Sequence, residues 1–152
     1  MGCILFVDDD KFFGMPYVRN LHEHFENRHV VDVCSRIDDA IHYFHSHREL
    51  VAIVLDVMMP PPESTEYSAS NIHELTENGS ATGIWYLRLL RRQIIERQVR
   101  IFILTNRAID LVQAAIPTLA FPAGMLEFDR KLAVPAVALP GRLAALLNRP
   151  IA

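Results

Sequence analysis

Hydrophobic residues gather along the chain in five short runs, each followed by polar residues. The clearest run is residues 51–55, which are all apolar and mostly β-branched. Such a run is typical of a strand that is buried on both faces of a sheet. Similar runs predict further strands at residues 3–7, 29–34, 100–104 and 125–128.

Between these runs, apolar residues recur at the spacing of amphipathic helices. In residues 80–97 the apolar positions three or four places apart are Ile84, Leu87, Leu90 and Ile94. Weaker stripes predict helices at residues 11–27, 35–47, 107–119 and 135–148. Ser35 and Asp38 fit a variant of the capping box at the start of the second of these.

Strands and helices therefore alternate five times. This alternation is typical of a parallel sheet that carries helices on both faces. With 152 residues, the chain has the length of one domain. We expect an α/β fold with a doubly wound five-stranded parallel sheet, formed by residues 1–152 as a single domain.

Composition and charge exclude several classes of protein. With 51% hydrophobic and 22% charged residues, the chain is globular rather than disordered. A net charge of −3 argues against binding to nucleic acid or to an anionic membrane. No apolar run is long enough to span a membrane, and the first residues lack the basic charge of a signal peptide. Cys3 and Cys34 fall in predicted strands, so we expect buried thiols in a cytoplasmic protein.

Polar side chains of chemical interest follow the predicted strands. Asp8 and Asp9 follow the first strand, Asp56 the third, Thr105 the fourth and Lys131 the fifth. Because the carboxyl ends of parallel strands meet at one edge of a sheet, we expect a single site there. Taken alone, Asp56 could cap an ordinary turn and Lys131 could be a solvated surface lysine. Their convergence favours the functional interpretation.

Each of these groups suits a distinct task. Three neighbouring carboxylates repel one another unless a cation is bound, and hard oxygen ligands suit Mg²⁺ or Mn²⁺. A carboxylate beside that cation can attack phosphorus and form an acyl phosphate. The hydroxyl of Thr105 and the ammonium of Lys131 would hold the remaining phosphoryl oxygens. The chain has only two lysines against thirteen arginines, which indicates a need for a compact point charge at Lys131.

From end to end, the chain resembles a receiver domain of two-component response regulators. Residues 4–10, Ile-Leu-Phe-Val-Asp-Asp-Asp, resemble the first strand and acid pair of that family. Residues 55–60, Leu-Asp-Val-Met-Met-Pro, resemble its phosphoacceptor motif, and residues 101–105 its hydroxyl-bearing strand. Residues 124–131 resemble its glycine, aromatic and lysine spacing. The resemblance implies a flavodoxin-like sheet with strand order 2-1-3-4-5.

The resemblance also implies what the site binds. Asp56 would accept a phosphoryl group from a histidine kinase or a histidine phosphotransfer protein. Asp8, Asp9, Asp56 and the backbone carbonyl of Met58 would hold Mg²⁺ or Mn²⁺, with Asp8 acting through water or directly. Enzymatic activity would be limited to self-phosphorylation and self-dephosphorylation of Asp56.

The same resemblance implies a switch. Thr105 would move toward the phosphoryl group, and Phe128 would rotate into the space that Thr105 leaves. The changed surface would control an unidentified output partner, and the face of the last two helices could form a homodimer. Because the chain ends soon after its last predicted helix, we expect a stand-alone receiver without a DNA-binding output domain.

Three features depart from the family pattern. Leu132 follows Lys131 where the family usually has a cis proline, and a non-prolyl cis bond costs about 2.5–4 kcal/mol. The bond could therefore be trans and aim Lys131 differently, and the sequence leaves this open. Asn106 stands where a small residue is usual, which would narrow access to the site. Residues 61–82 make a loop longer than the family's by about 19 residues, which is unusual for structureless chain.

Residues 61–82 are expected to form an inserted loop. They carry four glutamates and neither lysine nor arginine. A short helix could run from Ser70, as N-cap, to Asn78 before Gly79. Ile72 and Leu75 would then share a face and could dock the helix over the site as a lid. The alternative is a disordered surface excursion without a role.

Other interpretations remain open at the level of the sequence. A phosphatase of the haloacid dehalogenase type could use Asp8 as its nucleophile, but it would lack an acid pair after Lys131 and leave Asp56 without a role. A binding module could keep the receiver fold without phosphorylation. We interpret the arginines of residues 88–97 first as a solvated helix face and second as a docking surface.

Overall fold

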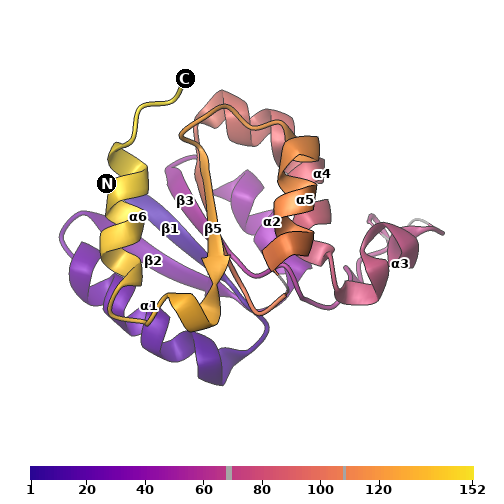
Figure 1. Ribbon diagram of the computed structural model, residues 1–152, viewed down its shortest axis with the longest axis horizontal. Helices are drawn as coiled ribbons and strands as arrows, with labels where there is room; N and C mark the ends of the chain where they lie inside the picture. The colour runs from indigo at the N-terminus through magenta and orange to yellow at the C-terminus, as the bar shows by residue number, and fades with distance from the viewer. Residues whose placement is uncertain (68–69, 108) are drawn as a thin grey trace.

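A computed structural model describes residues 1–67, 70–107 and 109–152. A five-stranded sheet with the order β2-β1-β3-β4-β5 forms its centre, and every strand pair in it is parallel (Figure 1). The strands are β1 (Gly2–Val7), β2 (His29–Cys34), β3 (Leu50–Leu55), β4 (Arg100–Thr105) and β5 (Leu126–Arg130). The expected α/β fold and its strand order are therefore confirmed.

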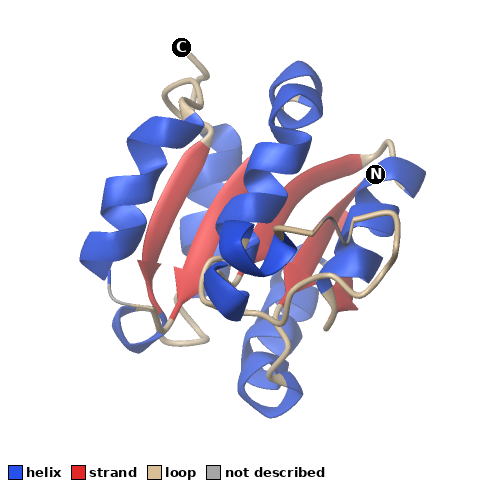
Figure 2. Cartoon of the chain, turned by 90° about the vertical axis from the view of Figure 1, so that its right-hand side faces the viewer, coloured by secondary structure: helices blue, strands red, loops and turns tan. Residues whose placement is uncertain are grey.

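Five helices of at least ten residues pack on this sheet, as the sequence predicted (Figure 2). They are α1 (Lys11–Phe25), α2 (Ile37–Ser46), α4 (Thr82–Arg97), α5 (Ile109–Leu119) and α6 (Leu139–Asn148). α1 and α6 cover one face, whereas α2, α4 and α5 cover the other. Residue 108, which falls in the fourth predicted helix, and residues 68–69 of the expected insert lie outside the described residues.

Alternate residues of the central strands pack into two hydrophobic cores on opposite faces of the sheet. In β1, Leu5 and Val7 join the core under α2 and α4, while Ile4 and Phe6 join the core under α1 and α6. In β3, residues 52–55 alternate between the same two cores. Because both faces are covered, a central strand needs apolar side chains at every position, which explains the unbroken apolar runs.

The expected capping of α2 and the expected start of α6 are wrong. α2 begins at Ile37, and its N-cap residue Arg36 makes no side-chain capping bond. The carboxylate of Asp38 instead accepts hydrogen bonds from the backbone amides of Glu63 and Ser64, at 2.9 and 3.2 Å. Asp38 binds the backbone of Glu63 and Ser64 rather than the start of α2, because these residues supply two amide donors to one carboxylate. α6 begins at Leu139 rather than at residue 135, since residues 136–138 form a separate turn.

The segment of residues 61–82 has local structure of its own. It contains the short helix α3 (Ile72–Leu75) and the 3₁₀ turn η1 (Glu77–Gly79). The N-cap of α3 is Asn71 rather than Ser70, and the helix ends early because Glu77, Asn78 and Gly79 all have positive φ, at 48°, 55° and 99°.

The position of α3 differs from the expected lid. In Figure 1 this helix projects sideways, beside α5. Leu75 lines a hollow of about 500 Å³ together with Ile84 of α4 and Leu111 of α5, whereas Ile72 is buried. The parts of the segment that border the acidic residues are Pro61 and Asn78–Ser80, which share a second hollow with Asp9 and Met58.

The arginines of α4 also have an unexpected role. Arg97 donates to the carbonyls of Phe44 and His47 at the end of α2, at 2.8 and 2.6 Å. Arg91 donates to the carbonyls of Leu119 and Ala120 at the end of α5. A helix C-terminus leaves carbonyls without partners, and a guanidinium can serve two of them at once. These two arginines therefore join helices together, and the expected solvated or docking face is wrong for them.

Candidate functional site

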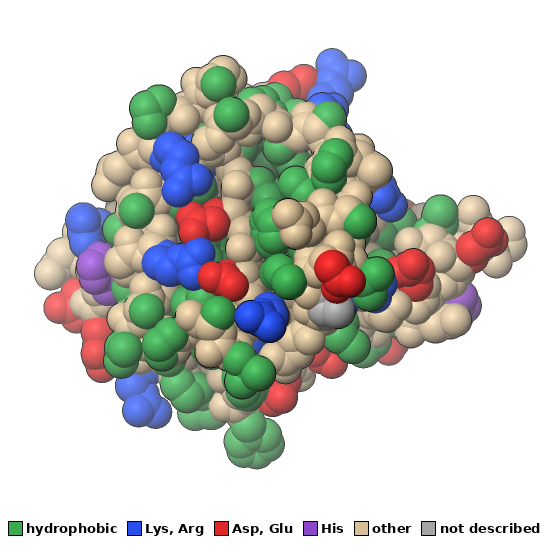
Figure 3. Space-filling view, viewed as in Figure 1, with side chains coloured by type: hydrophobic (Ala, Val, Ile, Leu, Met, Phe, Trp, Pro, Cys, Tyr) green, Lys and Arg blue, Asp and Glu red, His purple; other side chains and the backbone are tan. Residues whose placement is uncertain are grey.

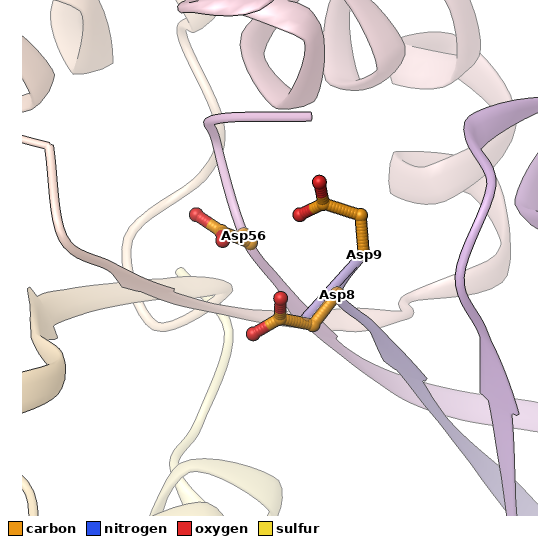
Figure 4. A group of neighbouring side chains, drawn as sticks. All are labelled: Asp8, Asp9 and Asp56. Atoms are coloured by element: carbon orange, nitrogen blue, oxygen red, sulfur yellow. The ribbon is translucent and has the colours of Figure 1, made fainter. Parts of the chain in front are cut away.

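The acidic residues lie at the ends of two paired strands. Asp8 follows β1 and Asp56 follows β3, and the last residues of these strands, Val7 and Leu55, are register partners. Asp8, Asp9 and Asp56 each offer an oxygen within 4.8 Å of the others (Figure 4). Asp8 and Asp56 are buried, whereas Asp9 is exposed. The structure thus brings together the three carboxylates that the sequence singled out.

Lys131 supplies the positive charge of this site. Its Nζ lies 2.7 Å from Oδ2 of Asp8 and 3.0 Å from Oδ2 of Asp56, and the residue is only 4% exposed. The bond between Lys131 and Leu132 is trans, because none of the peptide bonds in the described residues is cis. With this trans bond the ammonium of Lys131 contacts the carboxylates of both Asp8 and Asp56.

Burial and charge both shift the pKa values of these groups, in opposite directions for Lys131 and Asp8. Burial tends to lower the pKa of Lys131, but the carboxylates of Asp8 and Asp56 outweigh it and raise this pKa above its ordinary value. Burial raises the pKa of Asp8, against the bonds from Lys131 and the Asp10 amide. Partial desolvation of the carboxyl of Asp9, although the residue is exposed, also raises its pKa, and the like charge of Asp56 adds to the rise. A further cation beside the acids would stabilise their ionised forms.

Asp56 is held by three different donors. Its Oδ1 accepts a hydrogen bond of 2.8 Å from the hydroxyl of Thr105 and one of 3.2 Å from the backbone amide of Met58. Its Oδ2 accepts from Lys131. The hydroxyl of Thr105 in turn accepts a bond of 3.1 Å from the amide of Arg107. Both oxygens of Asp56 therefore face groups that can also bind a phosphoryl oxygen.

Gly83 allows α4 to approach the backbone of Asp56. A Cβ at Gly83 would lie 2.5 Å from the carbonyl oxygen of Asp56 and 2.8 Å from Cα of Val57. The amide of Gly83 donates to the Val57 carbonyl at 3.0 Å. A larger residue would have to push the helix away from the strand end, so this position requires glycine. Sequence reasoning missed it because only the fold brings residues 56 and 83 together.

Tyr17 and Arg107 are further residues that sequence reasoning missed. The hydroxyl of Tyr17 lies 2.6 Å from the carbonyl oxygen of Val134 and 3.1 Å from that of Lys131. Arg107 pairs with Glu77 at 3.2 Å and donates to the carbonyl of Ser80 at 2.6 Å. A buried tyrosine hydroxyl needs a partner, which was a usable signal for Tyr17. Nothing in the sequence identifies the carbonyl groups that Tyr17 contacts.

Phe128, the second residue of the expected switch pair, lies on β5 beside Ile103 of β4. Its ring is partly buried and lines a hollow of about 240 Å³ between β5 and the end of α5. Asn106, which was expected to narrow access to the site, is exposed. Thr105 and Phe128 therefore lie on neighbouring strands, β4 and β5.

The residues present fit a hard divalent cation. Three carboxylates offer oxygens close together, and the Met58 carbonyl accepts no hydrogen bond from the described residues. All of these are oxygen ligands, which suit Mg²⁺ or Mn²⁺ with some positions left to water.

Elsewhere on the molecule, acidic and basic side chains are interspersed on the face that Figure 3 shows. Among the described residues, no helix has the length and apolar character needed to cross a membrane.

Comparison with known proteins was made by sequence and by structure. No protein-family model matches the sequence, and a search of curated proteins finds no match. Solved structures do match. The Francisella response regulator 1452 receiver domain is 18% identical with a TM-score of 0.65, and the match covers 97% of this chain and 97% of that chain.

Two other structures give the same result. A CheY-like response regulator receiver domain protein from Methanospirillum hungatei is 13% identical with a TM-score of 0.68, covering 97% of this chain and 94% of that chain. A signal receiver domain of a DNA-binding response regulator from Colwellia psychrerythraea is 15% identical with a TM-score of 0.67, covering 98% and 100%. Identities this low inform on architecture alone. The chain has the fold of the receiver domains of response regulators.

Proposed function

We propose that the chain is a single receiver domain that takes a phosphoryl group on Asp56 and acts as a signalling switch. The observation that carries this proposal is the arrangement around Asp56. One buried carboxylate has a hydroxyl and an amide at one oxygen, an ammonium at the other, and two further acids beside it. A structural ion pair between Lys131 and one acid would need none of the other groups.

The chemistry proposed is transfer of a phosphoryl group from phosphohistidine. An oxygen of Asp56 forms a bond to phosphorus while the bond from phosphorus to the histidine nitrogen breaks, and its electron pair stays on the imidazole. The product is an acyl phosphate. Thr105 and Lys131 would exchange their bonds to Asp56 for bonds to the phosphoryl oxygens. Asp8, Asp9, Asp56 and the Met58 carbonyl would hold Mg²⁺, which when bound supplies charge neutralisation at the incoming anion.

The output is proposed to be a change of surface. When Thr105 turns to the phosphoryl group, Phe128 would rotate into the space that Thr105 leaves. Partners would be a histidine kinase or a histidine phosphotransfer protein on the input side and an unidentified protein on the output side, with a homodimer through the α5 and α6 face as one form. A signalling domain of this kind acts in the cytoplasm. The segment of residues 61–82 would be an insertion into the receiver.

Intact mass after incubation with acetyl phosphate and Mg²⁺ tests the proposal. The chain should gain the mass of one phosphoryl group, and excess EDTA should prevent the gain because the three acids then repel the donor. Asp56→Asn should abolish the gain. Labelling that persists in Asp56→Asn but vanishes in Asp8→Asn would favour the phosphatase interpretation. A wild-type chain that takes no label from acetyl phosphate or from phosphohistidine would favour a phosphorylation-independent binding module.

A further inference from the structure

The turn that carries Lys131 has few contacts of its own. It is the 3₁₀ turn η2 (Lys131–Ala133), which directly follows β5. Leu132 is 91% exposed and Ala133 is exposed as well, so neither side chain packs against the protein. Within the turn, the amide of Val134 donates to the Lys131 carbonyl at a long 3.3 Å. Yet the Lys131 side chain at its start reaches two buried carboxylates. Something outside the turn must fix its course.

Tyr17 of α1 is placed to do this. Its hydroxyl contacts the carbonyls of Val134, at 2.6 Å, and Lys131, at 3.1 Å, which are the two ends of the turn. A phenol has one proton, so the hydroxyl donates chiefly to the nearer Val134 carbonyl and shares the proton with the other. The residue is only 5% exposed, and its ring stacks on Phe6 of β1 with centroids 6.2 Å apart. The hydroxyl is thus rigidly held by the core.

The helix that carries Tyr17 is itself fixed to the acidic end of the site. Asp10 caps the first turn of α1 by accepting from the amide of Phe13 at 3.0 Å, and the Phe13 ring lies 5.0 Å from Nζ of Lys131. One rigid helix therefore connects Asp8–Asp10 to the turn of Lys131. A shift of the turn relative to this helix would move the ammonium away from the carboxylates.

We propose that Tyr17 is a positioning residue for phosphoryl transfer: its hydroxyl holds the η2 turn so that Lys131 reaches Asp8 and Asp56 together. The catalytic consequence rests on the proposed function, but the positioning of Lys131 does not. In a chain without proline after Lys131, this long-range bond is what sets the direction of the lysine.

The first test measures the access of Lys131 to solvent. Lys131 and the exposed Lys11 are the only lysines, so Lys11 is an internal reference for modification by an amine-acylating reagent followed by mass spectrometry. Tyr17→Phe should raise the acylation of Lys131 relative to Lys11 by about fivefold, the factor expected when one buried hydrogen bond no longer opposes opening. The wild type should protect Lys131.

Tyr86→Phe is the matched control. Tyr86 is fully buried on the other face of the sheet, and its hydroxyl also donates to a backbone carbonyl, that of Ala40, at 3.2 Å. This variant loses the same kind of bond, so it should lower stability to a similar extent. It should leave the protection of Lys131 unchanged.

The second test separates positioning from general loss of structure. Tyr17→Phe should lower the rate of phosphorylation by acetyl phosphate at saturating Mg²⁺ about tenfold, because a misplaced binding group loses the advantage of orientation. Its affinity for Mg²⁺, measured by calorimetry, should not fall, since the three acids are intact. Tyr86→Phe should change neither quantity. Equal Lys131 protection in Tyr17→Phe and wild type would overturn the proposal. A wild type that takes no label would contradict the proposed function instead, and the acylation result would still decide the role of Tyr17.

Discussion

Two segments bring Thr105 and Lys131 to Asp56: the Thr105 loop, defined as residues 105–107 at the end of β4, and the η2 turn. They are held by different kinds of contact. The Lys131 turn is fixed from within the core by the Tyr17 hydroxyl, through neutral bonds to backbone carbonyls. The Thr105 loop is fixed at the rim by Arg107, which pairs with Glu77 of η1 and donates to the Ser80 carbonyl. Glu77 is an exposed side chain, whereas Tyr17 is buried. One loop is tied to the core and the other to the segment of residues 61–82.

Because of this difference, the two sides of the site should differ in rigidity. Buried neutral hydrogen bonds are little affected by salt, whereas exposed ion pairs are weak and screened. The Lys131 side should therefore be rigid, and the Thr105 side should adjust at low free-energy cost. A switch that moves Thr105 while Lys131 stays in place needs this asymmetry. In the proposed switch, Glu77 and Ser80, which contact Arg107, would belong to the moving side.

The largest effect is expected on the rigid side, from removing Lys131. Lys131→Met leaves Asp8 and Asp56 buried without their counter-charge, which should lower the free energy of unfolding by about 3 kcal/mol in the absence of divalent cations. Mg²⁺ should restore much of the loss by supplying the missing positive charge. Urea denaturation with and without Mg²⁺ measures both values.

Lys11→Met is the control for this prediction, because Lys11 is exposed. It should change the free energy of unfolding by less than about 0.5 kcal/mol. An equal loss of stability for Lys131→Met with and without Mg²⁺ would mean that the cation does not replace the charge of the ammonium at the acids.

An intermediate effect is expected from Thr105→Val, which removes one bond to a charged oxygen of Asp56. The free energy of unfolding should fall by about 1.5–3 kcal/mol, the range for hydrogen bonds to charged groups. The acylation of Lys131 relative to Lys11 should change little, because Lys131 keeps its contacts to Asp8 and to the second oxygen of Asp56.

Thr76→Val gives the comparison for a neutral bond, since the buried Thr76 hydroxyl donates to the Ile72 carbonyl at 2.7 Å. Its cost should be about 1 kcal/mol. If Thr105→Val exposes Lys131 to acylation as Tyr17→Phe does, the two sides of the site are coupled and the comparison fails.

The smallest effect is expected from Glu77→Gln, which removes the exposed ion pair to Arg107. The free energy of unfolding should fall by about 0.2–1 kcal/mol at low ionic strength, and the difference from wild type should shrink in high salt because the pair is screened. Glu74→Gln, on the same segment, should have less effect. Identical losses for the two variants at every salt concentration would leave the Thr105 loop without an electrostatic anchor.

The sequence by itself determined the sheet and the content of the site. The three central strands were visible because a sheet covered on both faces demands consecutive apolar residues, as in residues 51–55. Asp8, Asp56, Thr105 and Lys131 could be grouped from the sequence because they follow parallel strands, whose carboxyl ends share one edge. Both inferences depend only on local patterns and on the regular geometry of a parallel sheet.

Only the tertiary structure decided which groups hold these residues in place. Asp38 binds the amides of Glu63 and Ser64 rather than the start of its own helix. Arg97 caps α2 from α4. Tyr17 reaches carbonyls that are 114 and 117 residues away in the chain. In each case a polar side chain has several possible partners, and local spacing favours none of them. The choice follows from which buried backbone groups lack a partner after the helices have packed, and that is fixed only when the whole chain is folded.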